Sequence, residues 1–200
     1  MDSEINVIIP LHEPNRNKIN RIKRLRRCIN CFSKISGMHI SIPSNIDLSL
    51  DGVRVCCQVV YHAQAYSVYS PGAARNKAIK QVESDNILCI DADLLCSPIL
   101  VDSLDVRASI CRQQGEMAFE MYPCLYLTKE ETERFDGDFQ GCLESFLRGE
   151  NHRVEGIALA SSCLLMNREW FLQLGGFDEQ FVGHGGEDLE LIDRLTRHYP

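Results

Sequence analysis

The sequence predicts an α/β fold with a mainly parallel sheet flanked by helices. Two short apolar runs, Ile5–Ile9 and Asn86–Ile90, have the length and continuity of strands that are buried on both faces. Between and after these runs, apolar residues recur at three- and four-residue steps, as in amphipathic helices. Strands that alternate with helices in this way imply a parallel sheet that is covered on both faces.

The first part of the chain contains a strand and a helix. The strand ends at Pro10 and opens into a loop that contains His12 and Glu13. A helix follows, because one apolar stripe repeats between basic residues at Ile19, Ile22, Leu25, Ile29 and Phe32. Residues 36–52 are rich in turn formers and hold at most one short strand.

The middle of the chain continues the alternation of strands and helices. Val53–Tyr61 is rich in β-forming residues, and Pro71-Gly72 then marks the start of a helix. After the strand Asn86–Ile90, Ser97-Pro98 is typical of another helix start, and Met117–Tyr122 favours a further strand.

An acidic stretch, Thr128–Gly149, interrupts this alternation, and its apolar residues recur at helical intervals. We expect a helical insertion that lies over the sheet edge or the functional site. After it, Ile157–Met166 predicts one buried strand and Arg168–Leu174 a short helix that ends at Gly175-Gly176. A last helix is predicted to begin at Glu187.

Composition excludes several classes of protein. Of the 200 residues, 44% are hydrophobic and 24% charged, which is ordinary for a soluble globular protein, and the formal net charge of −7 argues against general nucleic-acid binding. No apolar stretch could cross a bilayer, and Met1–Glu4 does not resemble a secretory signal, so we expect a cytoplasmic protein. A basic cluster at residues 16–27 is interpreted as the solvated face of a helix. The alternative is a patch that contacts phosphate or anionic lipid, the latter at the inner membrane face.

Two carboxylates, Asp91 and Asp93, follow the strand Asn86–Ile90 directly. The carboxyl end of a buried parallel strand opens into the crevice where α/β sheets bind ligands. Hard oxygen ligands in pairs suit Mg²⁺ or Mn²⁺, which proteins commonly hold together with substrate phosphates. The alternative is that Asp93 caps the next helix and Asp91 is merely solvated.

A second group of residues lies near the end of the chain. Gly183, Gly185 and Gly186 surround His184, and a loop of this kind can pass close to a ligand. Glu187-Asp188 then opens a helix, where the helix dipole tends to keep carboxylates ionised and able to accept a proton. An ordinary, well-capped helix has the same pattern, so that interpretation stays open.

Together, the two groups resemble motifs of the GT-A glycosyltransferases. The chain is most similar to the family 2 enzymes and to the related galactosyl- and N-acetylgalactosaminyltransferases, including bacterial capsule polymerases. Supporting matches are the strand Val7–Pro10 and the segment Ala74–Ile79. The resemblance implies a GT-A (Rossmann-like) domain over residues 1–200. Its expected parts are a nucleotide-binding part (1–122), an insertion (123–156) and an acceptor-side part (157–200).

The resemblance also implies roles for particular residues. Asp93 is the expected direct ligand of Mn²⁺ or Mg²⁺, with Asp91 nearer the metal or the ribose. Asp188 is the expected base for the acceptor hydroxyl, and Glu187 is expected to hold the acceptor or the donor sugar. The remaining positions would surround the substrates: Pro10, His12 and Glu13 at the nucleotide, Arg75 at the diphosphate, and His184, Gly185 and Gly186 at the sugar.

Three departures from the family pattern stand out. No Asp-Asp pair occurs between Met38 and Tyr61, where many relatives contact the nucleobase. Glu190 stands where the pattern has a further Asp. Many relatives supply a later histidine to the metal, so either the natural protein continues past Pro200 or its metal site is incomplete.

We therefore expect an inverting, metal-dependent glycosyltransferase that moves a sugar from a nucleotide diphosphate donor, UDP-linked by preference, to a glycan hydroxyl. Synthesis of a bacterial surface polysaccharide such as a capsule is the preferred context. One alternative is a nucleotidyltransferase, which would use Asp91 and Asp93 but has no evident need for Glu187-Asp188. The other is a non-catalytic module that binds nucleotide sugars.

Overall fold

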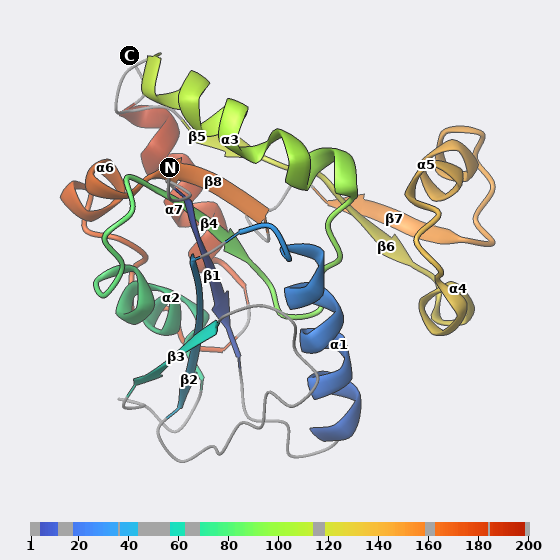
Figure 1. Ribbon diagram of the computed structural model, residues 1–200, viewed down its shortest axis with the longest axis horizontal. Coiled ribbons are helices and arrows are strands. Elements are labelled where there is room, and N and C mark those ends of the chain that lie inside the picture. Colours follow the sequence, from blue (N-terminus) through green and yellow to red (C-terminus); the bar gives the residue numbers. More distant parts are fainter. Residues whose placement is uncertain are drawn as a thin grey trace.

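The computed structural model describes residues 5–11, 18–35, 37–43, 57–62, 69–113, 119–158, 163–183 and 185–198. These residues form a six-stranded sheet, a two-stranded sheet and the helices around them (Figure 1). The six strands, in their order across the sheet, are β3 (Cys57–His62), β2 (Gly37–Pro43), β1 (Ile5–Pro10), β4 (Asn86–Ile90), β8 (Cys163–Asn167) and β5 (Phe119–Met121). The smaller sheet contains β6 (Cys124–Leu127) and β7 (Val154–Ala158).

Four neighbouring strands of the main sheet, β3, β2, β1 and β4, run parallel. Strand β8 is antiparallel to both of its neighbours, β4 and β5. The mainly parallel α/β fold predicted from the sequence is therefore confirmed. Because the carboxyl ends of parallel strands meet at one edge of a sheet, the ends of β1 and β4 lie beside each other at that edge.

Helices cover both faces of the main sheet (Figure 1). One face packs against α1 (Lys18–Cys31) and α3 (Pro98–Gln113). The other face packs against α2 (Pro71–Ile79), α6 (Arg168–Gln173) and α7 (Glu187–Arg197). This two-sided cover explains why every residue of β4 is buried.

The apolar stripe of α1 packs onto the sheet as its spacing predicts. Leu25, Ile29 and Phe32 are fully buried against a core that contains Ile9 and Ile40. Burial of each such side chain contributes about 1.5–3 kcal/mol to stability. The stripe therefore sets which face of α1 points away from the sheet.

The acidic stretch forms helices α4 (Lys129–Arg134) and α5 (Phe139–Leu147), as predicted, and these lie between strands β6 and β7 in the sequence. The four elements lie together beyond α1 and α3 (Figure 1). They have a small core of their own, in which Phe135, Cys142 and Val154 are buried. The insertion is thus built on a two-stranded sheet that the sequence interpretation missed.

The prediction of one strand over Ile157–Met166 is wrong. Strand β7 ends at Ala158 and pairs with β6, whereas β8 begins at Cys163 and pairs with β4 and β5. Residues 159–162, between the two strands, lie outside the described part. The physical difference is in burial: β7 has alternating burial, as expected of a strand covered on one face, and β8 is buried at four consecutive positions.

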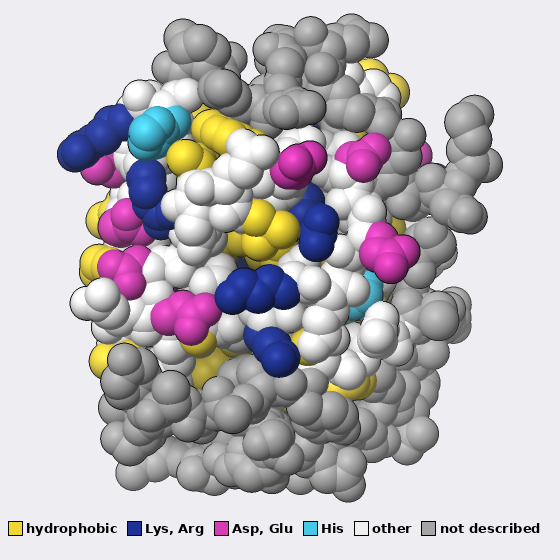
Figure 2. Space-filling view, turned by 90° about the vertical axis from the view of Figure 1, so that its left-hand side faces the viewer, with side chains coloured by type: hydrophobic (Ala, Val, Ile, Leu, Met, Phe, Trp, Pro, Cys, Tyr) yellow, Lys and Arg dark blue, Asp and Glu magenta, His cyan; other side chains and the backbone are white. Residues whose placement is uncertain are grey.

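Among the described helices, none is both long enough and apolar enough to span a bilayer. On the face over α2 and α6, acidic side chains are interspersed with the Lys and Arg side chains (Figure 2). The described side chains of this face therefore form no broad surface of a single charge.

Candidate active site

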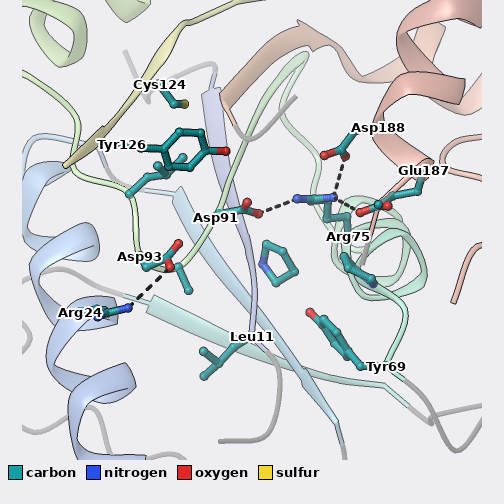
Figure 3. A pocket seen from close by; sticks show the side chains of 15 residues that line it. Leu11, Arg24, Tyr69, Arg75, Asp91, Asp93, Cys124, Tyr126, Glu187 and Asp188 are labelled. Carbon is teal, nitrogen blue, oxygen red and sulfur yellow. Dashed lines mark hydrogen bonds and ion pairs between the residues drawn. The ribbon is translucent and has the colours of Figure 1, made fainter. Parts of the chain in front are cut away.

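A cavity of about 430 Å³ lies at the carboxyl edge of the parallel strands (Figure 3). The ends of β1 and β4, the start of α2, the start of α7, one side of α1 and strand β6 all contribute to its wall. The predicted site residues that line it are Pro10, Arg75, Asp91, Asp93, Gly185, Glu187 and Asp188. Segments far apart in the sequence therefore meet around one hollow.

The two aspartates after β4 point in different directions (Figure 3). The Asp91 side chain, 36% exposed, turns toward Arg75, and its Oδ1 lies 2.6 Å from Arg75 Nη2. The Asp93 side chain, 62% exposed, turns toward α1, where its Oδ2 lies 3.9 Å from Arg24 Nη1. Asp93 is therefore the more accessible of the two carboxylates.

Arg75 lies at the centre of the charged groups. Its side chain is only 1% exposed, and the guanidinium also lies 3.2 Å from Asp188 Oδ1 and 3.8 Å from Glu187 Oε1. The Cζ atom of Arg75 lies over the Phe177 ring, 5.1 Å from the ring centroid. Burial lowers the pKa of Arg75, but Asp91 and Asp188 together raise it above the ordinary value, so the guanidinium stays charged.

The surroundings of Asp91 make its charged form less favourable, unlike those of Arg75. Burial raises the pKa of this carboxyl above its usual value, and the nearby Asp188 and Asp93 add to the rise although Arg75 opposes it. Asp91 thus gains a proton more readily than an ordinary aspartate, and its charge depends on Arg75.

A glycine-rich loop brings the start of α7 to the cavity. Gly186, at the helix N-cap, has a φ of +94°, and a Cβ there would lie 2.9 Å from Phe181 Cε1. The loop is tied to the start of α2, because Gly183 N–H donates to Tyr69 O (2.8 Å) and Ser70 Oγ donates to Phe181 O (2.9 Å). Only glycine satisfies both the backbone angle and the close packing at position 186.

Asn76 joins α2 to the segment that precedes α7. Its Nδ2 donates to Phe177 O and to Glu179 Oε1, each at 2.9 Å, and its Oδ1 accepts from Phe177 N–H at 2.9 Å. Helix α2 therefore contacts the segment before α7 through Asn76, and it contacts the first carboxylates of α7 through Arg75.

The two carboxylates at the start of α7 differ in accessibility. Glu187 is buried, and its Oε2 has no hydrogen-bond partner in the described part of the protein. The Asp188 side chain is 20% exposed. Its Oδ1 accepts a hydrogen bond from Arg75, and Oδ2 takes no part in that bond. Behind them, Leu191 and Leu195 anchor the helix in the core.

The sequence from residue 7 to residue 200 matches the model of the family described as "Glycosyltransferase like family 2". The chain belongs to the glycosyltransferase-like family 2. No match was found among curated proteins.

Two solved structures show the same fold as this family 2 chain. The crystal structure of S. aureus TarS 1-349 superposes with a TM-score of 0.54 at 14% identity, covering 98% of this chain and 55% of that one. The crystal structure of S. aureus TarS gives a TM-score of 0.55 at 15% identity, with 98% and 33% covered. The chain therefore spans about half of the first protein's length and a third of the second's, and its GT-A fold is confirmed.

The donor groups of the family 2 chain suit a divalent cation that binds together with a phosphate ligand. Within the described ranges, no group of three or more His, Cys, Asp or Glu side chains could hold a metal ion. Asp93 nevertheless offers an exposed carboxylate to the cavity, and Asp91 lies two residues away. Mg²⁺ commonly takes one or two carboxylates and completes its shell with water and substrate phosphates, so these residues fit such an ion.

Several site residues of the family 2 chain were not found from the sequence. Arg24 of α1 and Tyr126 of β6 line the cavity, as do Leu11, Tyr69 and Cys124. Arg24 was interpreted as part of a basic face that is solvated or contacts lipid or phosphate, and it was not assigned to the site. The insertion was expected over the sheet edge or the site, but no residue of it was named, and its strand β6 was not predicted. The predicted residues His12, Glu13 and His184 lie outside the described part.

Proposed function

We propose that this chain is an inverting, metal-dependent glycosyltransferase that moves a sugar from a UDP-linked donor to a glycan hydroxyl. The observation that carries the proposal is that Asp91 and Asp93 line the same cavity as Glu187 and Asp188, with Arg75 between the pairs (Figure 3). Membership of a glycosyltransferase-like family supports the reaction class. Synthesis of a bacterial surface polysaccharide is the proposed context.

Sugar transfer from a nucleotide diphosphate needs help at two places. The departing diphosphate gains negative charge, and the incoming hydroxyl is a poor nucleophile that must lose a proton. In our proposal, Asp93 and the nearby Asp91 hold Mn²⁺ or Mg²⁺, which neutralises charge on the departing oxygens when it is bound. Pro10, His12 and Glu13 would contact the nucleotide, as the family resemblance implies.

Asp188 is the proposed base. Its second oxygen, Oδ2, takes the proton of the acceptor hydroxyl while the hydroxyl oxygen bonds to the anomeric carbon and the carbon–oxygen bond to the diphosphate breaks. Arg75 holds the other oxygen, Oδ1, and so orients the carboxylate. Because a single displacement occurs at the anomeric carbon, the configuration inverts. Glu187, with His184, Gly185 and Gly186, would hold the sugars.

For Arg75 we propose a different part from the one that the resemblance implies. The guanidinium is directed at carboxylates, and the side chain is 1% exposed. We therefore propose that it positions Asp91 and Asp188 and opposes the rise in the pKa of Asp91, and that it does not bind the diphosphate directly.

The test is a screen of nucleotide sugars for Mn²⁺-dependent donor hydrolysis, with Asp93→Asn and Asp188→Asn as variants. Asp102→Asn and Asp193→Asn are matched controls, because each removes an exposed carboxylate that pairs with a surface cation away from the cavity. We expect roughly 100-fold or greater loss in Asp188→Asn, the usual range for a positioned acid–base group. A similar loss is expected in Asp93→Asn, because the metal ion would lose its ligand, and no loss is expected in the controls. Equal turnover in all five proteins would overturn both assignments.

Calorimetry of UDP with Mn²⁺ separates the enzyme from a non-catalytic module. A module would bind UDP in a Mn²⁺-dependent way and hydrolyse none of the donors. That outcome would overturn the proposed catalysis and leave the nucleotide-sugar site in place.

A further inference from the structure

We infer that Arg24 is a binding residue for the diphosphate of the donor, supplied by a helix whose basic residues would otherwise be taken for a solvated surface. This inference rests on the proposed function. It assigns a role to a side chain that the sequence motifs do not include.

The charge balance of the cavity calls for a cation that is available to an anionic ligand. Among the described residues that line it, the carboxylates outnumber the guanidinium groups four to two. A diphosphate brings at least two more negative charges, and close approach of like charges in a partly buried site is strongly unfavourable. A divalent cation would neutralise only part of this negative charge, so a second positive group would still favour diphosphate binding.

Of the two arginines in the described part of the cavity wall, only Arg24 can bind an anionic ligand. Both terminal nitrogens of Arg75 are engaged by carboxylates, and its side chain is 1% exposed. The Arg24 side chain is 52% exposed and meets Asp93 at 3.9 Å, the outer limit of an ion pair. Its guanidinium donors are therefore available to a ligand in the cavity (Figure 3).

The packing of α1 holds Arg24 in place. The next residue, Leu25, is fully buried in the core, as is Cys28 one turn further on. Arg27, also one turn from Arg24, donates from Nη2 to Phe135 O at 2.9 Å and so ties α1 to the insertion. The backbone at position 24 is thus anchored on two sides, while its side chain reaches over the rim toward Asp93.

The contact with Asp93 suggests how Arg24 works with a metal ion. A cation held by Asp93 would repel the guanidinium, since both are positive, and would leave Arg24 to donate to a phosphate oxygen. An arginine gives charge-assisted hydrogen bonds to phosphate with two donors in a fixed plane. Removal of Arg24 is therefore expected to weaken diphosphate binding without weakening the binding of Mn²⁺ alone.

Isothermal titration calorimetry of wild type, Arg24→Ala, Arg24→Lys and Lys23→Ala tests the inference with four probes: Mn²⁺ alone, uridine, UDP with Mn²⁺ and pyrophosphate with Mn²⁺. Lys23 is the matched control, because it is an exposed cation on the same helix and does not line the cavity. The thermal unfolding midpoint of each variant verifies that it is folded.

We expect Arg24→Ala to weaken UDP and pyrophosphate binding about tenfold, the low end for a charge-assisted hydrogen bond at a partly exposed site. Uridine and Mn²⁺ should bind as to wild type, Arg24→Lys should recover part of the loss, and Lys23→Ala should show none.

Two results would overturn the inference alone: equal UDP affinity in Arg24→Ala and Lys23→Ala, or a loss for uridine as large as that for UDP. A wild type that binds pyrophosphate but not UDP would overturn the uridine part of the proposed function, and the pyrophosphate series would still decide the role of Arg24. A wild type that binds neither would overturn both.

Discussion

Arg75 Nη2 lies 2.6 Å from Asp91 Oδ1, so α2 is joined to the loop after β4 inside the cavity. The same guanidinium reaches Asp188 at the start of α7. One buried side chain therefore connects the two acidic motifs, which are separated by almost half of the chain.

Replacement of Arg75 with Met is expected to destabilise the fold strongly. Removing one partner of a buried ion pair leaves uncompensated charge and typically costs about 3–5 kcal/mol. The half-exposed Asp91 can relax into water, so we expect a loss near 3 kcal/mol, measured by urea unfolding. Arg197→Met is the control, since its partner Asp193 is also exposed and such pairs contribute about 0–1 kcal/mol. Equal losses in the two variants would contradict a structural role for Arg75.

Asn76→Ala should destabilise the segment that precedes α7. The substitution leaves the N–H and C=O of Phe177 without their partners, and each unsatisfied buried group costs about 1–3 kcal/mol. We expect faster hydrogen exchange at the Phe177 amide and weaker UDP binding. Lys77→Ala, at the next and exposed position, should change neither. Unchanged exchange in Asn76→Ala would show that the loop is held by other contacts.

Glu131 should make the insertion sensitive to acid. Its carboxylate accepts from Arg153 Nη2 (2.6 Å) and Arg134 Nε (2.8 Å), and the hydrogen bond from Arg153 is the main reason that its pKa lies below the ordinary value of 4.5. A depressed pKa in the folded state gives stability that is present above the unfolded-state pKa and is lost as the pH falls through the folded-state pKa.

Thermal unfolding at several pH values measures this effect. Glu131→Gln should lower the midpoint clearly at pH 6–7. Its difference from wild type should shrink as the pH falls below the ordinary value of 4.5 and through the lower folded-state pKa, where the wild-type carboxylate gains a proton. Glu133→Gln, on the same helix and exposed, should unfold like wild type throughout. A difference that does not change with pH would rule out the ion pairs as its cause.

Tyr126 is expected to contribute to substrate binding from the insertion. The residue is 53% exposed, and its ring lies at the cavity near Asp91 and Asp93 (Figure 3). An aromatic ring of this kind can pack against a sugar or a base, so Tyr126→Ala should lower kcat/KM about tenfold and Tyr126→Phe should retain most activity. Leu147→Ala removes an exposed apolar side chain elsewhere in the insertion and is the control. Full activity in Tyr126→Ala would remove β6 from the substrate site.

The elements that the sequence predicted well are those whose burial leaves a local pattern. The unbroken apolar run of β4 and the periodic stripe of α1 both follow from the faces that they bury. The run from Ile157 to Met166 was misjudged, because apolar content alone cannot tell a strand buried on one face from one buried on both. The break between β7 and β8 depends on which partners each strand finds.

The sequence by itself determined the family, the α/β fold and the two acidic motifs, because these depend on residue types at fixed local spacings. Only the tertiary structure decided that Arg75 lies between the motifs, that Arg24 faces the cavity and that β6 brings Tyr126 to its wall. The physical reason is that chain topology and core packing set the direction of each of these side chains. Whether a basic residue faces water or a ligand depends on what the opposite elements place in front of it.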